Sequence, residues 1–222
     1  SPTAIADLAE LDRVLGCDII CLHTPLTRSG LFPTYHLLDA SRLAAIGPDA
    51  LIINAGRGEV VDNRALLELF QNGAEFKVAL DVWENEPGID TGLMGFVSLA
   101  TPHIAGYSLE GKVNGTEMVF DAFKQWSGLT ANKASKTVYK APLLLQPTSV
   151  NQAILECYDV ADDHQRMLSA MAEAGSDQAR VAQAFDQLRK DYPVRREFSY
   201  YGIERTTEEN LAQYHSLGFA IL

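Results

Sequence analysis

The sequence predicts an α/β protein, in which the distal part of a doubly wound parallel sheet is followed by a small α+β domain. Two observations support this fold class. Short apolar runs at 18–22, 50–54, 77–82 and 96–100 are separated by stretches with helical spacing. Such uninterrupted runs are typical of parallel strands that are buried on both faces. The pattern changes after Gly128, so we expect a second unit there.

Helices are expected between these strands, as in successive βαβ units. Apolar spacing and capping signals indicate helices at 5–15, 41–46, 63–71 and 108–127. Asp62 can cap the third of them, because its carboxylate can accept hydrogen bonds from the free N–H groups of the first helical turn.

The chain is expected to comprise a first domain at 1–128, a linker at 129–148 and a C-terminal α+β domain at 149–222. The linker is rich in Thr, Lys, Ala and Pro, which is typical of segments between domains. The elements expected after it are helices at 150–173, 176–190 and 207–217 and strands at 197–204 and 219–222.

The composition is that of a globular protein, with 47% hydrophobic and 21% charged residues. The net charge of −11 argues against nucleic acid as a partner. No apolar run approaches the length of a membrane span, so no membrane partner is expected. Cys17, Cys21 and Cys157 cannot all pair and show no metal-ligand pattern. We therefore expect buried, reduced thiols, a cytoplasmic protein and no metal site.

Three polar clusters follow three of the expected strands. Arg57 lies between two glycines after the second strand, Glu86 precedes Pro87 after the third, and His103 follows Thr-Pro after the fourth. In open α/β sheets, ligands bind at the edge formed by the carboxyl ends of the strands. We therefore expect these three side chains to share one site.

The three side chains suit the reduction of a 2-oxo acid by a nicotinamide, or the reverse reaction. The planar guanidinium of Arg57 can hold a carboxylate through two hydrogen bonds. His103 can exchange a proton with the substrate oxygen. Glu86 can fix the tautomer of that imidazole and favour its charged form.

These clusters resemble the D-isomer-specific 2-hydroxyacid dehydrogenase family. The resemblance implies a Rossmann-like fold, NAD as cofactor and a catalytic trio of Arg57, Glu86 and His103. It also implies that residues 1–128 are the C-terminal portion of a dinucleotide-binding domain. The cofactor contacts that it implies are Thr24, Ala55, Gly56, Arg57, Asp81 and Gly106.

Several of these assignments have alternatives. Glu84 competes with Glu86, but the family motif places the acid directly before proline, so we expect Glu84 to be solvated. Asp81 would accept a hydrogen bond from the nicotinamide amide, or else cap the loop at 82–87. Gly106 would allow close approach of the nicotinamide, or simply form a turn. Tyr107 is implied to touch substrate, with packing against the loop as the alternative.

The stretches at 103–112, 82–84 and 185–198 are similar to one subgroup of the family. That subgroup acts on a small phosphorylated hydroxy acid and forms a homodimer through its C-terminal domain. Arg195 and Arg196, adjacent in an acidic chain, are candidates for a phosphate site, with surface ion pairs as the alternative. Two other functions stay open: a dehydrogenase of the glycerate or phosphoglycerate type, and an NAD-sensing protein without catalysis that resembles corepressors of this fold.

The glycine-rich phosphate loop expected of such a domain is absent, since no G-x-G-x-x-G occurs in the sequence. In the usual strand order, the first two strands lie between the strands expected at 18–22 and 50–54. We therefore expect the strands at 18–22 and 50–54 to lack neighbours in this chain. We also expect an upstream segment to belong to the native protein.

Overall fold

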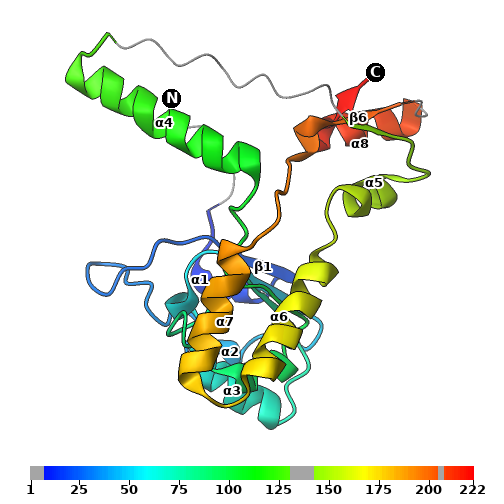
Figure 1. The fold of residues 1–222 in the computed structure, drawn as a ribbon. Helices are drawn as coiled ribbons and strands as arrows, with labels where there is room; N and C mark the ends of the chain where they lie inside the picture. Colours follow the sequence, from blue (N-terminus) through cyan, green and yellow to red (C-terminus); the bar gives the residue numbers. More distant parts are fainter. Residues whose placement is uncertain (1–7, 131–142, 205–207) are drawn as a thin grey trace. The chain divides into compact units, whose positions relative to one another are not determined.

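The computed structural model describes residues 8–130, 143–204 and 208–222 (Figure 1). The chain forms two compact units. The first unit runs to Ala105 and includes Ala161–Asp191, and the second contains Gly106–Val160 and Tyr192–Leu222. Of the described helices, none is long and apolar enough to span a membrane.

The first unit is built on a four-stranded parallel sheet whose strand order follows the sequence. Its strands are β1 (Ile19–Leu22), β2 (Leu51–Asn54), β3 (Lys77–Leu80) and β4 (Leu99–Ala100). Its helices are α1 (Leu11–Leu15), α2 (Ala40–Leu43), α3 (Asn63–Gln71), α6 (Val160–Ala174) and α7 (Gln178–Lys190), with short 3-10 turns η1 (Gly58–Val60) and η2 (Thr91–Gly95). Ile20, Ile52 and Val78 are neighbours in the register and are buried in its core.

The strand order corrects one expectation. β1 and β2 are directly paired over four residues, from Ile19 with Leu51 to Leu22 with Asn54. The prediction that two further strands lie between them is therefore wrong. Each strand along this part of the chain adds to the same side of the sheet, so the strand at 18–22 is the direct neighbour of the strand at 50–54.

The expectation of buried cysteines also needs correction. Burial alternates along β1, where Ile20 and Leu22 are buried while Ile19 and Cys21 are exposed. The reason is that described residues cover only one face of β1, so every second side chain along the strand is exposed. Cys17 is exposed as well, whereas burial, followed by the charge of the neighbouring Glu156, raises the pKa of the Cys157 thiol to about 12.

Local signals at helix ends are confirmed by the structure. Asp62 caps α3 and accepts a hydrogen bond from Ala65 N at 2.9 Å. Ser108 caps α4 (Leu109–Ser127), which ends at Gly128 in the left-handed conformation with φ of 69°. These ends depend on residues close in sequence, so the sequence alone was sufficient to predict them.

The second unit contains a three-stranded sheet. Besides α4 it comprises β5 (Leu143–Leu145), α5 (Val150–Cys157), η3 (Phe198–Tyr200), β6 (Tyr201–Ile203), α8 (Glu208–Leu217) and β7 (Ala220–Ile221). All its strands are parallel, with β6 in the centre, so this unit too has an α/β arrangement where the sequence suggested α+β. Its core is formed by Leu145, Ala153, Tyr201, Ile203, Tyr214 and Phe219.

The compact units differ from the expected domains. The helix α4, expected at the end of the first domain, belongs to the second unit, while α6 and α7 belong to the first. The reason is packing: these two helices bury Met167, Met171, Val181 and Phe185 in the core around β1–β4. Of the expected linker, 131–142 lies outside the described residues, and Leu143–Leu145 forms β5 instead.

Candidate active site

The turn after β2 carries Arg57. Asn54 is fully buried at the end of the strand, and its side chain spans the turn: Oδ1 accepts a hydrogen bond from Gly56 N at 3.2 Å, and Nδ2 donates to Arg57 O at 3.0 Å. The Arg57 guanidinium is exposed and donates from Nη1 to Gly56 O at 2.7 Å. Asn54 therefore sets the backbone that presents Arg57, a role that the sequence analysis missed although a polar residue ending a buried strand is a signal for it.

Gly58 lets this turn approach the loop after β3. A Cβ atom at this buried position would overlap the backbone carbonyl of Trp83. We expect Gly58→Ala to lower the midpoint of thermal unfolding by roughly 3–10 °C, because overpacking against rigid backbone costs about 1–3 kcal/mol. Circular dichroism during heating measures this.

The matched control for that substitution is Gly47→Ala. A Cβ atom at Gly47 would meet no atom within 4 Å, and its φ is not positive. We expect its unfolding midpoint to stay close to the wild-type value. Equal midpoints for Gly58→Ala and Gly47→Ala would contradict the close approach at Trp83.

Glu86 and His103 form a hydrogen-bonded pair. Glu86 Oε2 lies 2.7 Å from His103 Nδ1, and Glu86 Oε1 accepts a hydrogen bond from Trp83 N at 2.8 Å. The carboxylate is thus fixed on the loop after β3 while it orients the ring. The His103 backbone has φ of 56°, which is uncommon for a residue with a side chain.

The surroundings of His103 favour its charged form. The hydrogen bond to Glu86 raises the pKa of His103 above its ordinary value of 6.5, against the opposing effect of burial. The charges of Glu86 and Asp81 raise this pKa further, whereas Arg189 lowers it. About a third of the ring remains exposed, so a substrate can reach it. The pair therefore has the properties of a proton donor and acceptor.

Asp81 organises the turn that carries His103. Its Oδ1 accepts hydrogen bonds from Thr101 Oγ1 at 2.6 Å and Ile104 N at 2.8 Å, and its Oδ2 accepts from Ala105 N at 3.0 Å. The backbone carbonyl of Asp81 also accepts from His103 N at 2.6 Å. The Asp81 carboxylate therefore caps the turn at 101–105, and not the loop at 82–87 that the sequence suggested.

Glu84 is not solvated, so that expectation is wrong. Its Oε1 lies 2.7 Å from His36 Nε2, and its Oε2 accepts a hydrogen bond from Asn63 N at 2.9 Å. The reason is that the first turn of α3 has free N–H groups that need acceptors. His36 also approaches Asp62 through its other ring nitrogen, at 3.4 Å.

The His36, Asp62 and Glu84 side chains form a cluster whose possible ligand atoms lie within 4.8 Å of one another. The carboxylates lie at different nitrogens of one imidazole ring, and each accepts a backbone N–H of α3. This arrangement ties the start of α3 to the loop after β3. It also leaves Glu86 as the acid that pairs with His103.

The carboxyl ends of β1 and β2 meet at Thr24 and Gly56. A Cβ atom at Gly56 would lie 3.0 Å from Leu22 O and 3.5 Å from Thr24 O, so the two turns are in close contact. Within the described part of the chain, the buried Thr24 Oγ1 has no hydrogen-bond partner. A buried hydroxyl normally has a hydrogen-bond partner, and a polar group of a bound ligand could provide one here. The residues at this edge therefore fit the dinucleotide implied by the sequence.

Gly106 and Tyr107 belong to the second unit. A Cβ atom at Gly106 would meet nothing within 4 Å. The Tyr107 ring has Lys112 Nζ 4.0 Å from its centroid and the edge of Tyr192 at 5.7 Å. Tyr107 thus has packing partners within its own unit, in Lys112 and Tyr192.

The two adjacent arginines also have partners. Arg196 Nε donates to Glu110 Oε1 at 2.5 Å, and its guanidinium lies 3.3 Å from the Tyr200 ring centroid. Burial would raise the pKa of Glu110, but hydrogen bonds from Glu197 N and from its own backbone, together with Arg196, lower it. Arg195 stacks on Tyr158 at 4.6 Å. For Arg196 the ion-pair alternative holds, so its charge is already balanced.

Two segments of the chain match known domain families. Residues 3–105 match the D-isomer specific 2-hydroxyacid dehydrogenase, NAD binding domain, and residues 132–218 match a domain of unknown function, DUF3410. The erythronate-4-phosphate dehydrogenase of Teredinibacter turnerae is 44% identical to the chain over 225 residues. That of Marinobacter nauticus is 43% identical over 226 residues.

Both alignments cover 97% of the chain but 58% of the relative. The chain therefore spans little more than half the length of these curated relatives. The resemblance seen in the three polar clusters is confirmed, because residues 3–105 match the NAD-binding domain of the D-isomer-specific 2-hydroxyacid dehydrogenases.

Proposed function

We propose that this chain is part of an enzyme that oxidises 4-phospho-D-erythronate to 2-oxo-3-hydroxy-4-phosphobutanoate with NAD, in pyridoxine biosynthesis. The observation that carries the proposal is the Glu86–His103 pair, with 2.7 Å between Oε2 and Nδ1, in a chain that carries an NAD-binding domain of this family. The names of the relatives indicate the substrate.

Each residue of the trio has a separate task in this proposal. Arg57 holds the substrate carboxylate, which leaves the 2-hydroxyl near His103. The His103 ring takes the hydroxyl proton as the carbonyl forms, and Glu86 stabilises the resulting imidazolium. A bound nicotinamide would supply the acceptor for the hydride that leaves C2. Thr24, Ala55, Gly56, Asp81 and Gly106 are the residues that would hold the dinucleotide, along with the Arg57 backbone.

A substrate panel tests the proposal in the full-length protein. We expect NAD reduction with 4-phospho-D-erythronate at a kcat/KM at least a hundredfold above that with glycerate, 3-phosphoglycerate or lactate. Preference for 3-phosphoglycerate or glycerate would favour another dehydrogenase of the family. NAD binding without turnover of any hydroxy acid would favour the NAD-sensing function.

The pH dependence should differ between the two reaction directions. Oxidation needs a neutral His103 ring to accept a proton, so kcat for oxidation should rise with pH through the raised pKa of His103. Reduction needs the charged ring, so its kcat should fall over the same interval. In Glu86→Gln the charge and the strong hydrogen bond are lost, so both inflections should move to lower pH. Identical inflections in the variant would contradict the pairing.

We also propose a homodimer formed through the C-terminal domain. Leu144 and Leu222 lie over Gly202 on one face of the second sheet, and both are at least half exposed. Apolar side chains on an open sheet face favour association. Sedimentation velocity of wild type and Leu144→Lys tests this, with a dimer expected for the first and a monomer for the second.

The proposed location is the cytoplasm. The exposed, unpaired Cys17 and Cys21 suit a reducing compartment. Fractionation of cells that make the full-length protein tests this location.

A further inference from the structure

The helices α6 and α7 lie outside the segment that matches the NAD-binding domain, yet they complete the unit that carries the Glu86–His103 pair. Each helix buries apolar side chains in the core around the first sheet, including Met167 from α6 and Phe185 from α7. The domain of unknown function that matches residues 132–218 therefore contributes structure directly to the catalytic unit.

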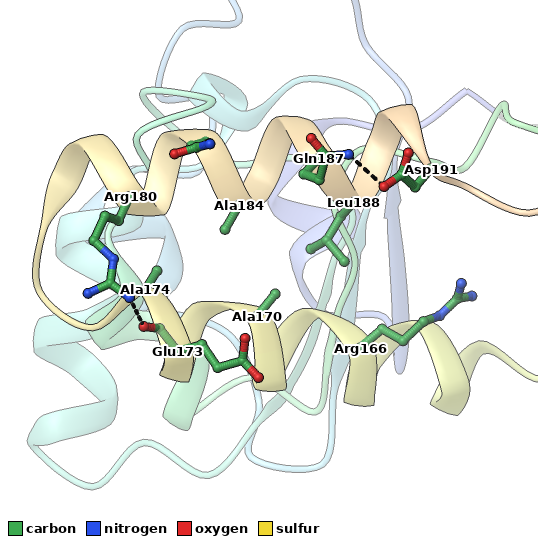
Figure 2. Close-up of a pocket in the computed structure, with 10 residues that line it drawn as sticks. Arg166, Ala170, Glu173, Ala174, Arg180, Ala184, Gln187, Leu188 and Asp191 are labelled. Atoms are coloured by element: carbon green, nitrogen blue, oxygen red, sulfur yellow. Dashed lines mark hydrogen bonds between the residues drawn. The ribbon is translucent and has the colours of Figure 1, made fainter.

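The two helices form a hairpin, with α6 and α7 side by side (Figure 2). Asp177 caps α7, and Arg180 Nη2 donates to Glu173 O of α6 at 2.6 Å. Near the other end of α7, Gln187 Nε2 donates to Asp191 Oδ2 at 2.6 Å. Because Arg180 joins the two helices at their connection and both are anchored in the core, the hairpin can hold its contacts with the sheet in fixed positions.

The first such contact joins α6 to β4. Ala100 N donates to His164 Nδ1 at 3.0 Å. The bond to the neighbouring strand β3 is made by the next residue, since Thr101 N donates to Leu80 O. β4 is an edge strand of the sheet, so the His164 ring provides an acceptor where no further strand is described. Ala100 is the last residue of β4 and lies three residues before His103.

Further contacts reach the loop that carries Glu86. Gln178 Oε1, at the start of α7, would lie 3.5 Å from a Cβ atom at Gly88, two residues after Glu86. Arg189 of α7 lies close enough to His103 for its charge to lower the pKa, against the larger effect of the Glu86 hydrogen bond. The hairpin thus binds the end of β4 just before His103, and Gln178 lies next to Gly88 just after Glu86.

We propose that His164 is a positioning residue, which fixes the end of β4 through Ala100 and thereby holds His103 in line with Glu86. His164 touches neither cofactor nor substrate in this proposal. The α6–α7 hairpin accordingly acts as a support for the catalytic turn. The consequences for turnover depend on the dehydrogenase function proposed above, whereas the consequences for the His103 ring do not.

Two substitutions separate the hydrogen bond from the packing. In His164→Asn, Oδ1 occupies the place of Nδ1 and can still accept from Ala100 N. In His164→Leu, a methyl group occupies that place and Ala100 N loses its acceptor. Leu has the higher helix propensity, so any harm it does is not due to the helix. The control is Gln187→Ala, which removes the exposed hydrogen bond to Asp191 on the same hairpin.

The first measurement is a pH titration of the five histidine rings by NMR in the purified chain. We expect the raised pKa of His103 to fall toward 6.5 in His164→Leu and to be retained in His164→Asn and Gln187→Ala. The second measurement is kcat in the full-length protein. We expect a loss of about tenfold or more in His164→Leu with KM within about twofold, and recovery to within about threefold in His164→Asn.

An unchanged His103 titration in a folded His164→Leu protein would overturn the inference. So would an Asn variant that behaves like the Leu variant. If His164→Leu does not fold, as judged by circular dichroism, the same comparison is made with His164→Ala. Absence of turnover in the wild-type protein would remove the proposed function but leave the titration as a valid test of His164.

Discussion

His103→Gln should lower kcat for hydroxy-acid oxidation by about 10³-fold in the full-length protein, with a smaller change in KM. Glutamine can still form hydrogen bonds, but it cannot take the proton that leaves the substrate hydroxyl. The Glu86 carboxylate would then lose the imidazolium that it stabilises. Steady-state rates of NAD reduction at saturating substrate measure this loss.

His215→Gln is the matched control for that substitution. His215 is exposed in the last turn of α8, in the second unit, and has no assigned role. The control should keep near wild-type turnover. A His103→Gln enzyme that retains more than a tenth of the wild-type kcat would show that another group transfers the proton.

Arg57→Lys should lower kcat/KM by about 10²-fold or more, although the charge is kept. The reason is geometric, because an ammonium group cannot reproduce the two parallel hydrogen bonds of a guanidinium to a carboxylate. The loss should be seen in KM as well as in kcat, since the carboxylate is held in both the ground state and the transition state.

Arg64→Lys provides the control for Arg57→Lys. Arg64 lies on the exposed side of α3, where its Nε is 3.0 Å from Glu68 Oε1, and an exposed pair of this kind contributes little. We expect its kinetic constants to match the wild type. If Arg57→Lys also matched the wild type, the role of Arg57 in holding the carboxylate would be refuted.

Much of the fold could be predicted because its signals are local. Apolar runs mark the strands, and Asp62 and Ser108 cap helices within three residues of their own positions. The family resemblance likewise depends on short clusters, each directly after a strand. Such features need no knowledge of distant contacts.

Features that depend on distant contacts were missed. The pairing of β1 with β2 follows from sheet order, which strand sequences do not specify on their own. Glu84 is hydrogen-bonded to His36, which lies 48 residues away in the chain, and is therefore not solvated. The apolar faces of α6 and α7 pack on the first sheet. The sequence shows that these helices have apolar faces, but it does not show which sheet covers them.

Asp81 links the turn that bears His103 to the end of β3. Its carboxylate at the end of β3 accepts from the turn that bears His103, through Thr101, Ile104 and Ala105. Opening of this turn must break these hydrogen bonds, so we expect its amides to exchange hydrogen more slowly than those of an open loop.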